Sequence, residues 1–415
     1  MSPLTPYRRL FALAGSRYLV LAFLARLPLA MGQLGTLLLV SSATGRYAAG
    51  GLASGALALG TAVGAPVAGG LADRRGQRPV VAVQSLGAAT GFLGLVLLVT
   101  AGATLPTVVI AAALTGLMVP QVGPLARVRW SPLVRRRAGG DPRLVSTAFS
   151  YESAVDEASF VLGPALVGGL VALVDPTVAV VAAALLLATF GTAFALHPTA
   201  RVAHSLPVRS VAGGRLITLE LSVLVAVNGG IGVVFGGTQT GLTVLATEAG
   251  VPGLAGVVYG LLGLGSAAAG VATAWVPARF GHERRLVAAS AAMVLLAVPL
   301  LIVPTLAGTA VVVTALGLAV APAMISAYSA AERLVPGHRA GVAMTLLASG
   351  AVVGYAAGAA VAGRLGDRAG PTAALAVPVG GAAAALVLAL ATAGRLRRSL
   401  RAHPTTPQSR VASSA

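Results

Sequence analysis

Long apolar stretches follow one another along the chain, separated by short segments that carry charges, prolines and glycines. They do not alternate polar and apolar residues, as the strands of a membrane barrel would. Each has roughly the 20 residues that an α-helix needs to cross the hydrocarbon core of a bilayer. Because backbone groups in a bilayer must hydrogen-bond within their own segment, the pattern predicts helices. Twelve spans are predicted, at residues 18–41, 48–72, 79–101, 105–126, 145–174, 177–196, 217–246, 254–277, 286–304, 308–330, 341–363 and 371–394.

The longest polar interruption separates the sixth span from the seventh and divides the chain into two sets of six. It contains two prolines and a pair of adjacent glycines. Two equal sets of spans predict an internal repeat. The predicted fold is therefore an all-α integral membrane protein built from two pseudo-symmetric six-helix bundles. The bundles take residues 1–196 and 217–394, a cytoplasmic linker takes 197–216, and a basic, disordered tail takes 395–415.

The composition agrees with this pattern and excludes several classes of protein. Of the 415 residues, 57% are apolar and 10% are charged, whereas soluble domains carry about 25% charged residues. All 29 basic residues are arginines, because the sequence has no lysine. A P-loop ATPase and a Schiff-base enzyme are therefore excluded. The sequence also has no cysteine, so disulfides and thiolate metal sites are excluded.

The arginines predict the orientation of the chain in the membrane. If the N-terminus is cytoplasmic, 25 of the 29 arginines fall in cytoplasmic segments, as expected because positive loops are retained inside the cell. Both termini are thus predicted to be cytoplasmic, in the inner (plasma) membrane. This explains the net charge of +18 without nucleic-acid binding. The five histidines all fall in cytoplasmic segments without metal-ligand spacing, so neither a metal nor a cofactor is expected.

A compact basic motif follows the second span, and an eroded copy follows the eighth at 274–281, with Arg279 and Gly281 at the matching offset. A tight basic turn is one interpretation of the first copy. The sharp copy reads Gly69-Gly70-Leu71-Ala72-Asp73-Arg74-Arg75-Gly76-Gln77-Arg78.

The motif, the six-plus-six arrangement and the basic central segment together resemble the major facilitator superfamily. The resemblance covers essentially the whole chain and departs from the usual pattern at Gln77, where a basic residue is common. It implies a transporter in which the motif latches the two halves at their cytoplasmic ends. Asp73 would face the start of span eleven near Gly341, where the helix dipole favours a carboxylate. Gly69, Gly76, Arg74 and Arg78 would complete the latch.

Glycines four residues apart mark several spans. This spacing places small residues on one helix face, where they permit close backbone approach. Pairs or triplets occur at Gly51/Gly55, Gly60/Gly64, Gly256/Gly260 and Gly350/Gly354/Gly358. In the superfamily, spans two and eleven, and five and eight, form the contact between halves, so these faces are candidates for it. Generic helix packing is the alternative.

The fifth span carries three carboxylates, Glu152, Asp156 and Glu157. Ionisable groups inside a span are costly and mark substrate or proton pathways. Glu152 and Asp156 share a helix face, whereas Glu157 points elsewhere. Arg26 is the one basic residue predicted inside a span, at a depth similar to that of Asp156. We therefore expect Arg26 to pair with Asp156 or Glu152 while another carboxylate exchanges protons; a permanent ion pair without proton traffic is the alternative.

The same span continues with Gly163, Pro164, Gly168 and Gly169. This run resembles, in part, the antiporter motif of drug/proton exporters in the superfamily, although its spacer is longer. The resemblance implies export.

Polar residues in other spans are candidates for substrate contact. They are Gln33, Asn228, Gln239, Tyr328 and Tyr355. Each has the alternative of a hydrogen bond between packed helices.

The sequence therefore predicts a secondary transporter, working as a monomer by alternating access and exporting small, fairly apolar organic molecules in exchange for protons. The proton gradient would supply the energy. An uptake symporter of the same fold is the first alternative. An integral-membrane enzyme is the second, but it lacks intramembrane histidine, cysteine or lysine for a catalytic site.

Overall fold

The computed structural model describes residues 5–139, 141–202, 218–273, 280–303, 305–335 and 340–402. Within these ranges the chain forms helices and no strand. Most of the predicted linker, the predicted tail beyond Ala402 and residues 274–279 lie outside them, whereas residues 395–402 of that tail are helical and not disordered as predicted. Of the eroded copy of the basic motif, only Phe280 and Gly281 are therefore described.

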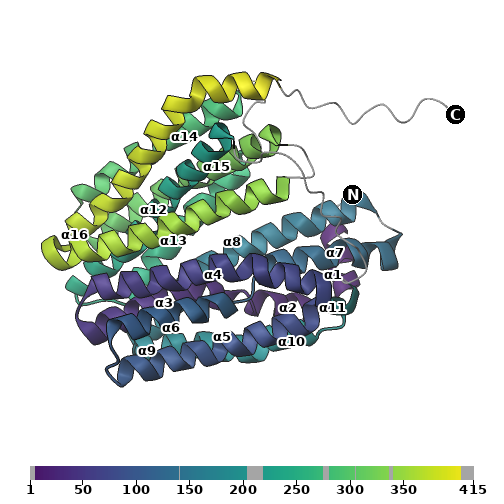
Figure 1. Ribbon diagram of the computed structural model, residues 1–415, viewed down its shortest axis with the longest axis horizontal. Coiled ribbons are helices and arrows are strands. Elements are labelled where there is room, and N and C mark those ends of the chain that lie inside the picture. The colour runs from purple at the N-terminus through teal and green to yellow at the C-terminus, as the bar shows by residue number, and fades with distance from the viewer. Residues whose placement is uncertain are drawn as a thin grey trace.

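The first half of the chain, coloured purple to teal in Figure 1, packs as one bundle. Its helices are α1 (Thr5–Ala14), α2 (Ser16–Leu24), α3 (Leu27–Thr44), α4 (Tyr47–Arg75), α5 (Gln77–Thr100), α6 (Leu105–Met118), α7 (Val122–Ala138), α8 (Pro142–Leu173), α9 (Pro176–Leu186), a π-turn η1 (Leu187–Gly191), α10 (Thr192–Leu196) and α11 (Thr199–Val202).

The second half forms the other bundle, green to yellow in the same view. Its helices are α12 (Leu219–Glu248), α13 (Leu254–Ala272), α14 (His282–Ala297), a 3-10 turn η4 (Val298–Leu301), α15 (Leu306–Leu334) and α16 (Ala340–Ala402). The backbone of α16 leaves helical geometry at Ala369 and Gly370, so α16 consists of two consecutive helices.

The described helices agree with the predicted spans. Ten helical segments are long and apolar enough to cross a membrane. One of them, within α16, contains two predicted spans, and the shorter α13 contains another. Each of the twelve predicted spans overlaps a described helix. The all-α membrane fold is confirmed.

The fourth span differs in detail from the prediction. The helix breaks between Met118 and Val122, because Pro120 cannot donate a backbone hydrogen bond and disfavours helical geometry at the residue before it. It then resumes as α7 and continues to Ala138, twelve residues beyond the predicted end at 126. Residues 127–138, predicted to lie beyond the span, are therefore helical, and this changes the site described below.

The two bundles touch through α4 with α16 and through α8 with α13. On the first contact, a Cβ atom on Gly51 or Gly55 would collide with the backbone of Ala359 or Ala356. On the second, a Cβ on Gly256 would meet the Pro164 carbonyl. Close approach between halves thus explains these glycines.

The other glycine repeats pack within one bundle. Gly60 and Gly64 abut the backbone of α6, and Gly350, Gly354 and Gly358 abut that of α12. For these positions, generic close packing is the correct interpretation.

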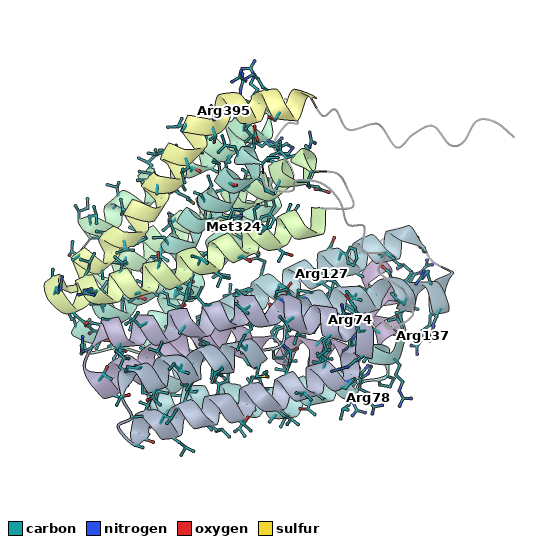
Figure 2. All side chains as sticks on the ribbon, in the orientation of Figure 1. Arg74, Arg78, Arg127, Arg137, Met324 and Arg395 are labelled. Carbon is teal, nitrogen blue, oxygen red and sulfur yellow. The ribbon has the colours of Figure 1, made fainter. Side chains whose placement is uncertain are left out.

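In Figure 1 the two bundles converge where α4 begins and diverge toward the side where the chain ends lie. Figure 2 shows Arg74, Arg78 and Arg137 at that diverging end of the first bundle, and Arg395 near the corresponding end of the second. We call this the arginine-rich end. The opposite, converging end is called the Asp367 end after the residue that closes it.

We predict that Gly354→Val destabilises the fold, because its side chain would collide with the backbone of Gly229 on α12. Overpacking of this kind costs about 1–3 kcal/mol, so the melting temperature in detergent should fall by several degrees. Gly94→Val is the matched control, since a Cβ there meets nothing within 4 Å. Equal melting temperatures for the two variants would contradict the close packing.

Candidate functional site

Arg26 lies at a break between two helices. Pro28 has no backbone N–H, and the helix is interrupted at Ala25 and Arg26. The Arg26 amide bonds to the Phe23 carbonyl, three residues back, so it leaves free the Ala22 carbonyl that it would engage in a regular helix. The Arg26 Nη1 donates to that carbonyl at 3.1 Å. The break therefore both positions the guanidinium and satisfies one of its donors.

The same guanidinium bridges the two carboxylates that share a face of α8. Its Nη2 donates to Glu152, and its Nε donates to Asp156 Oδ1 at 2.9 Å. We expected Arg26 to pair with one of these carboxylates, and in the structure it pairs with both. The second oxygen of Asp156 accepts from Arg127 Nη2 at 2.6 Å. Arg26, Arg127, Glu152 and Asp156 form the group that we call the ion-pair cluster, with two positive and two negative charges.

Helix α7 supplies further contacts to the cluster. Trp130 donates its indole Nε1 to Glu152 Oε1 at 2.5 Å. A Cβ on Gly123 would lie 2.6 Å from Asp156 Oδ1, so this position must be glycine for the carboxylate to lie where it does. Gly123, Arg127 and Trp130 recur at helical spacing and therefore face α8 together.

The two carboxylates differ in their access to solvent. Glu152 is completely buried and Arg26 is 4% exposed, whereas Asp156 is 25% exposed and Arg127 33% exposed. Glu152 is thus enclosed between a guanidinium and an indole, while Asp156 lies at the accessible side. Removing one member of a buried ion pair leaves an uncompensated charge, which is strongly destabilising.

Aromatic rings cover the enclosed side of the cluster. Tyr18 and Tyr151 both pack edge-on against Trp130, with ring centroids 5.8 and 6.4 Å from it. Tyr18 is 1% exposed, and its hydroxyl makes no hydrogen bond with the described residues. The rings exclude water from Glu152.

The sequence analysis missed the contribution of α7, because it ended the fourth span at residue 126 and counted Arg127 and Arg129 among the arginines of the following cytoplasmic segment. The break at Pro120 hid the helix, and three arginines after Pro132 look like a loop. The usable signal was Trp130, one of two tryptophans, three residues after Arg127. Arg26 is therefore not the one arginine inside the membrane-spanning segments.

Arg129 points to the other side of α7 and has a structural role. It is 1% exposed, donates to Gln77 Oε1 at 2.9 Å and lies 3.7 Å from the Phe194 ring centroid. Its Nη1 also donates to the Phe194 carbonyl at 3.0 Å. A basic residue at position 77 would face this guanidinium, which explains why the motif has glutamine there. Burial lowers the pKa of the neighbouring His197, and the charges of Arg129 and Arg17 lower it further.

Glu157 stands apart from the ion-pair cluster. It is exposed, and the structure gives it no hydrogen bond or ion pair with a described residue. This agrees with its predicted position on a different helix face.

The latch motif ends α4 at the arginine-rich end. Gly76 has a φ of 88°, a conformation that favours glycine, and thereby turns the chain into α5. Asp73 and Arg74 are exposed and Arg78 is half-buried. Among the described side chains, none pairs with Asp73, and space is open beside Gly69. The residues just before α16, 336–339, lie outside the described ranges.

The antiporter-like run of α8 lies between the bundles. A Cβ on Gly163 would lie 2.6 Å from the side chain of Ala30 on α3. Gly168 abuts the Gly253 carbonyl beside α13, Pro164 abuts Gly256, and Gly169 faces open space. The run therefore forms part of the contact between halves. It follows the three carboxylates on the same helix.

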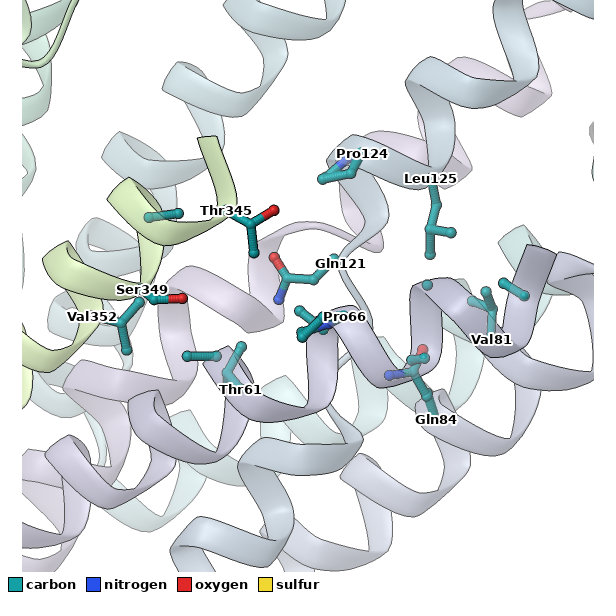
Figure 3. Close-up of a pocket in the computed structure, with 16 residues that line it drawn as sticks. Thr61, Pro66, Val81, Gln84, Gln121, Pro124, Leu125, Thr345, Ser349 and Val352 are labelled. Atoms are coloured by element: carbon teal, nitrogen blue, oxygen red, sulfur yellow. The ribbon is translucent and has the colours of Figure 1, made fainter. Parts of the chain in front are cut away.

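A cavity of about 360 Å³ lies between the bundles (Figure 3). We call it the central cavity. Gln121 lies in the middle of the view, and Thr345 and Ser349 approach it from α16. Gln84 is 6% exposed and lines the cavity from α5. The lining is completed by Thr61, Ala62, Ala65, Pro66, Ala68, Gly69, Ala72, Val81, Pro124, Leu125, Ala348 and Val352.

The five polar residues proposed for substrate contact do not line this cavity. Gln239 donates to the Tyr355 hydroxyl at 2.7 Å, and that hydroxyl lies 2.9 Å from Ser54 Oγ on the opposite bundle. Ser54 in turn donates to the Gln33 carbonyl. These residues form a hydrogen-bond chain between the halves.

The other two candidates lie within the second bundle. Asn228 is fully buried, and its amide makes no hydrogen bond with the described residues. Tyr328 packs against the core of that bundle. The polar groups of the central cavity were missed because Gln84, Gln121, Thr345 and Ser349 come from three separate helical segments whose proximity only the fold reveals.

We predict that Arg26→Leu destabilises the protein, because it leaves Glu152 buried and unpaired. The expected cost is about 3–5 kcal/mol, measured as thermal unfolding in detergent. The double variant Arg26→Leu/Glu152→Leu should recover much of the loss, since neither charge then remains buried. Additive losses in the double variant would argue against a coupled pair.

Comparison with known proteins identifies the family. The model of the Major Facilitator Superfamily matches residues 11–350. The nucleoside transporter NupG superposes with a TM-score of 0.68 at 17% identity, over 92% of this chain and 100% of NupG. A bacterial homolog of the human lysosomal transporter Spinster, in an inward-facing and occupied conformation, gives 0.63 at 15% identity, over 95% and 100%.

The human organic anion transporter MFSD10 gives a TM-score of 0.56 at 21% identity, over 94% of this chain and 100% of its own. Comparison with curated protein sequences gave no match. The family match explains the two bundles, the motif after α4 and the cavity between the halves. The chain belongs to the major facilitator superfamily and is a multi-pass membrane transporter, not an enzyme.

Proposed function

We propose that this protein is a secondary transporter that exports small, neutral organic molecules in exchange for protons by alternating access. The observation that carries the proposal is the position of the ion-pair cluster beside the central cavity. Gln121 and Pro124 line the cavity, and Gly123, in the same turn, touches the Asp156 carboxylate. A movement of the Asp156 side chain would therefore displace the turn of α7 that lines the cavity.

Asp156 is the carboxylate suited to proton exchange. It is partly exposed and ties α8 both to Arg26 and to Arg127. Protonation removes its negative charge and weakens both ion pairs, which loosens the contacts among α3, α7 and α8. Glu152 is enclosed and keeps the cluster in place, because Arg26 and Trp130 both donate to it. Protons moving down their gradient would supply the energy without a cofactor.

The lining of the central cavity indicates the substrate class. Its polar groups are the amides of Gln84 and Gln121 and the hydroxyls of three threonine or serine residues, and the rest of its lining is apolar. No charged side chain is among its lining residues. Neutral molecules with a few hydrogen-bonding groups fit these walls better than ions, whose burial without a counter-charge is costly.

The proposed direction and orientation rest on weaker patterns in the sequence. The antiporter-like run on α8 favours export. The arginines at the diverging end support the proposal that this end faces the cytoplasm of a plasma-membrane protein, in which case the central cavity opens inward. An uptake symporter of the same fold is the competing function.

We predict that Asp156→Asn uncouples transport from the proton gradient. In inside-out vesicles with an acidic interior, the wild-type protein should accumulate substrate against its gradient, whereas the variant should only equilibrate it. Glu157→Gln is the matched control: it removes the neighbouring negative charge, but Glu157 forms no ion pair with a described residue, so the variant should retain coupling. Accumulation that requires the opposite proton gradient would favour uptake, and coupling unaffected by Asp156→Asn would contradict the role of Asp156.

The cavity amides should control affinity. We predict that Gln121→Leu and Gln84→Leu each weaken substrate binding by about tenfold, the effect of losing one hydrogen bond worth about 1.5 kcal/mol. Substrates would be found by screening a compound panel for proton release from detergent-solubilised protein. Gln33→Leu serves as the comparison, because the Gln33 side chain does not line the central cavity. A loss confined to Gln33→Leu would move the site toward the Asp367 end.

A further inference from the structure

The N-terminus of α4, one of the helices in the contact between the two bundles, is capped by a residue of the opposite bundle. Asp367, at the end of the first segment of α16, accepts the backbone N–H of Tyr47 at 2.6 Å and that of Ala48 at 2.9 Å. These are the first two residues of α4. Each oxygen of the carboxylate accepts one of the two donors.

The N-terminus of α4 depends on this contact. The first N–H groups of a helix have no partner within it, and the helix dipole favours a negative charge there. The residue at the N-cap position, Arg46, gives no side-chain cap. Asp367 therefore provides, from the opposite bundle, the acceptor that an N-cap residue ordinarily provides. It can do so only while the bundles touch at this end.

The sequence around Asp367 repeats the latch motif. Leu71-Ala72-Asp73-Arg74-Arg75-Gly76 corresponds to Leu365-Gly366-Asp367-Arg368-Ala369-Gly370. Each aspartate precedes by three residues a glycine with positive φ, 88° at Gly76 and 73° at Gly370. Each also lies at the C-terminal end of a helix of the α4–α16 contact.

The two helices run antiparallel. Tyr47 lies against Gly363, Gly51 against Ala359 and Gly55 against Ala356. The end of each helix consequently lies beside the start of the other, and the two aspartates occupy equivalent places at opposite ends of the contact. Glycine and alanine form most of this contact, with one hydrogen bond between Ser54 and Tyr355, so few large side chains must move when the helices separate.

We propose that Asp367 is a second latch, reciprocal to the one expected for Asp73. In the conformation of this structure Asp367 caps α4 and holds the Asp367 end closed. When that end opens, Asp367 releases α4, and Asp73 caps the start of α16 at the arginine-rich end. The inference rests on the proposed alternating access and adds the residue that stabilises the inward-open state.

The surroundings of Asp367 suit a bond that must break repeatedly. Its carboxylate is exposed beside a cavity of about 610 Å³ that also contains Glu248 and three arginines. Water and the guanidinium groups of Arg46, Arg364 and Arg368 can stabilise the carboxylate after release. A fully buried aspartate would incur a desolvation cost each time this end closed, whereas the exposed Asp367 carboxylate avoids most of that cost.

The test measures the ratio of the two states. Because the chain has no cysteine, Arg137→Cys and Arg395→Cys introduce a spin-label pair across the arginine-rich end without background. Distance distributions then report the inward-open and inward-closed populations. Asp367→Ala should reduce the ratio of open to closed by about fivefold, the usual effect of losing a helix cap. Asp367→Asn keeps one neutral acceptor oxygen, so its ratio of open to closed should lie between those of the wild type and Asp367→Ala.

Glu248→Gln is the matched control. It removes one negative charge from the same cavity, but Glu248 has no bond to the start of α4 in the structure, so the ratio should stay as in the wild type. Asp73→Ala should shift the ratio in the opposite direction. If Asp367→Ala does not fold, Asp367→Asn carries the same test.

The outcomes separate the latch from the proposed function. Two populations whose ratio is unaffected by Asp367→Ala, or equally affected by Glu248→Gln, would contradict the latch while leaving alternating access intact. One distance, identical in the wild type and in every variant, would contradict both.

Discussion

The requirement that a charge inside the bilayer find a counter-charge organises the first bundle. Arg26 is placed by a helix break, and α8 brings two carboxylates to it on one face. Because two carboxylates exceed one guanidinium, α7 must contribute Arg127 and, by its indole, Trp130. The break at Pro120 gives α7 the freedom to approach. Charge neutralisation within the cluster thus determines how α7 and α8 pack beside Arg26. It also leaves the Asp156 carboxylate near the cavity.

Contacts between the bundles follow a different principle from contacts within the cluster. They consist of glycine and alanine backbone surfaces along α4 with α16 and α8 with α13. Dispersion between close backbones holds such surfaces without interlocked side chains. The ion-pair cluster therefore lies inside one bundle, whereas the bundles meet through close backbone surfaces and a few hydrogen bonds, between Ser54 and Tyr355 and from the start of α4 to Asp367. This division allows each bundle to move as a unit.

The sequence predicted the helices well, because bilayer thickness fixes their length and composition reveals them. It also predicted that Arg26 pairs with Asp156 or Glu152, since similar depth and a shared helix face can be inferred from the sequence; the structure shows contacts with both. It failed where a proline divided one span: the predicted span ended at residue 126, so Arg127 and Trp130 were left outside it. The central cavity escaped prediction for another reason. Gln84, Gln121 and Thr345 are isolated polar residues in their own segments, and their convergence depends on how whole helices are arranged.

The bond from Arg129 to Gln77 carries a consequence for how this family can vary. The guanidinium of Arg129 is buried against Phe194 and occupies the place that a basic side chain at position 77 would need. A homologue with lysine or arginine at 77 must therefore lose the positive charge at 129 or open a path to water beside it. Positions 77 and 129 are therefore expected to covary, so that one of them, but not both, carries a positive charge.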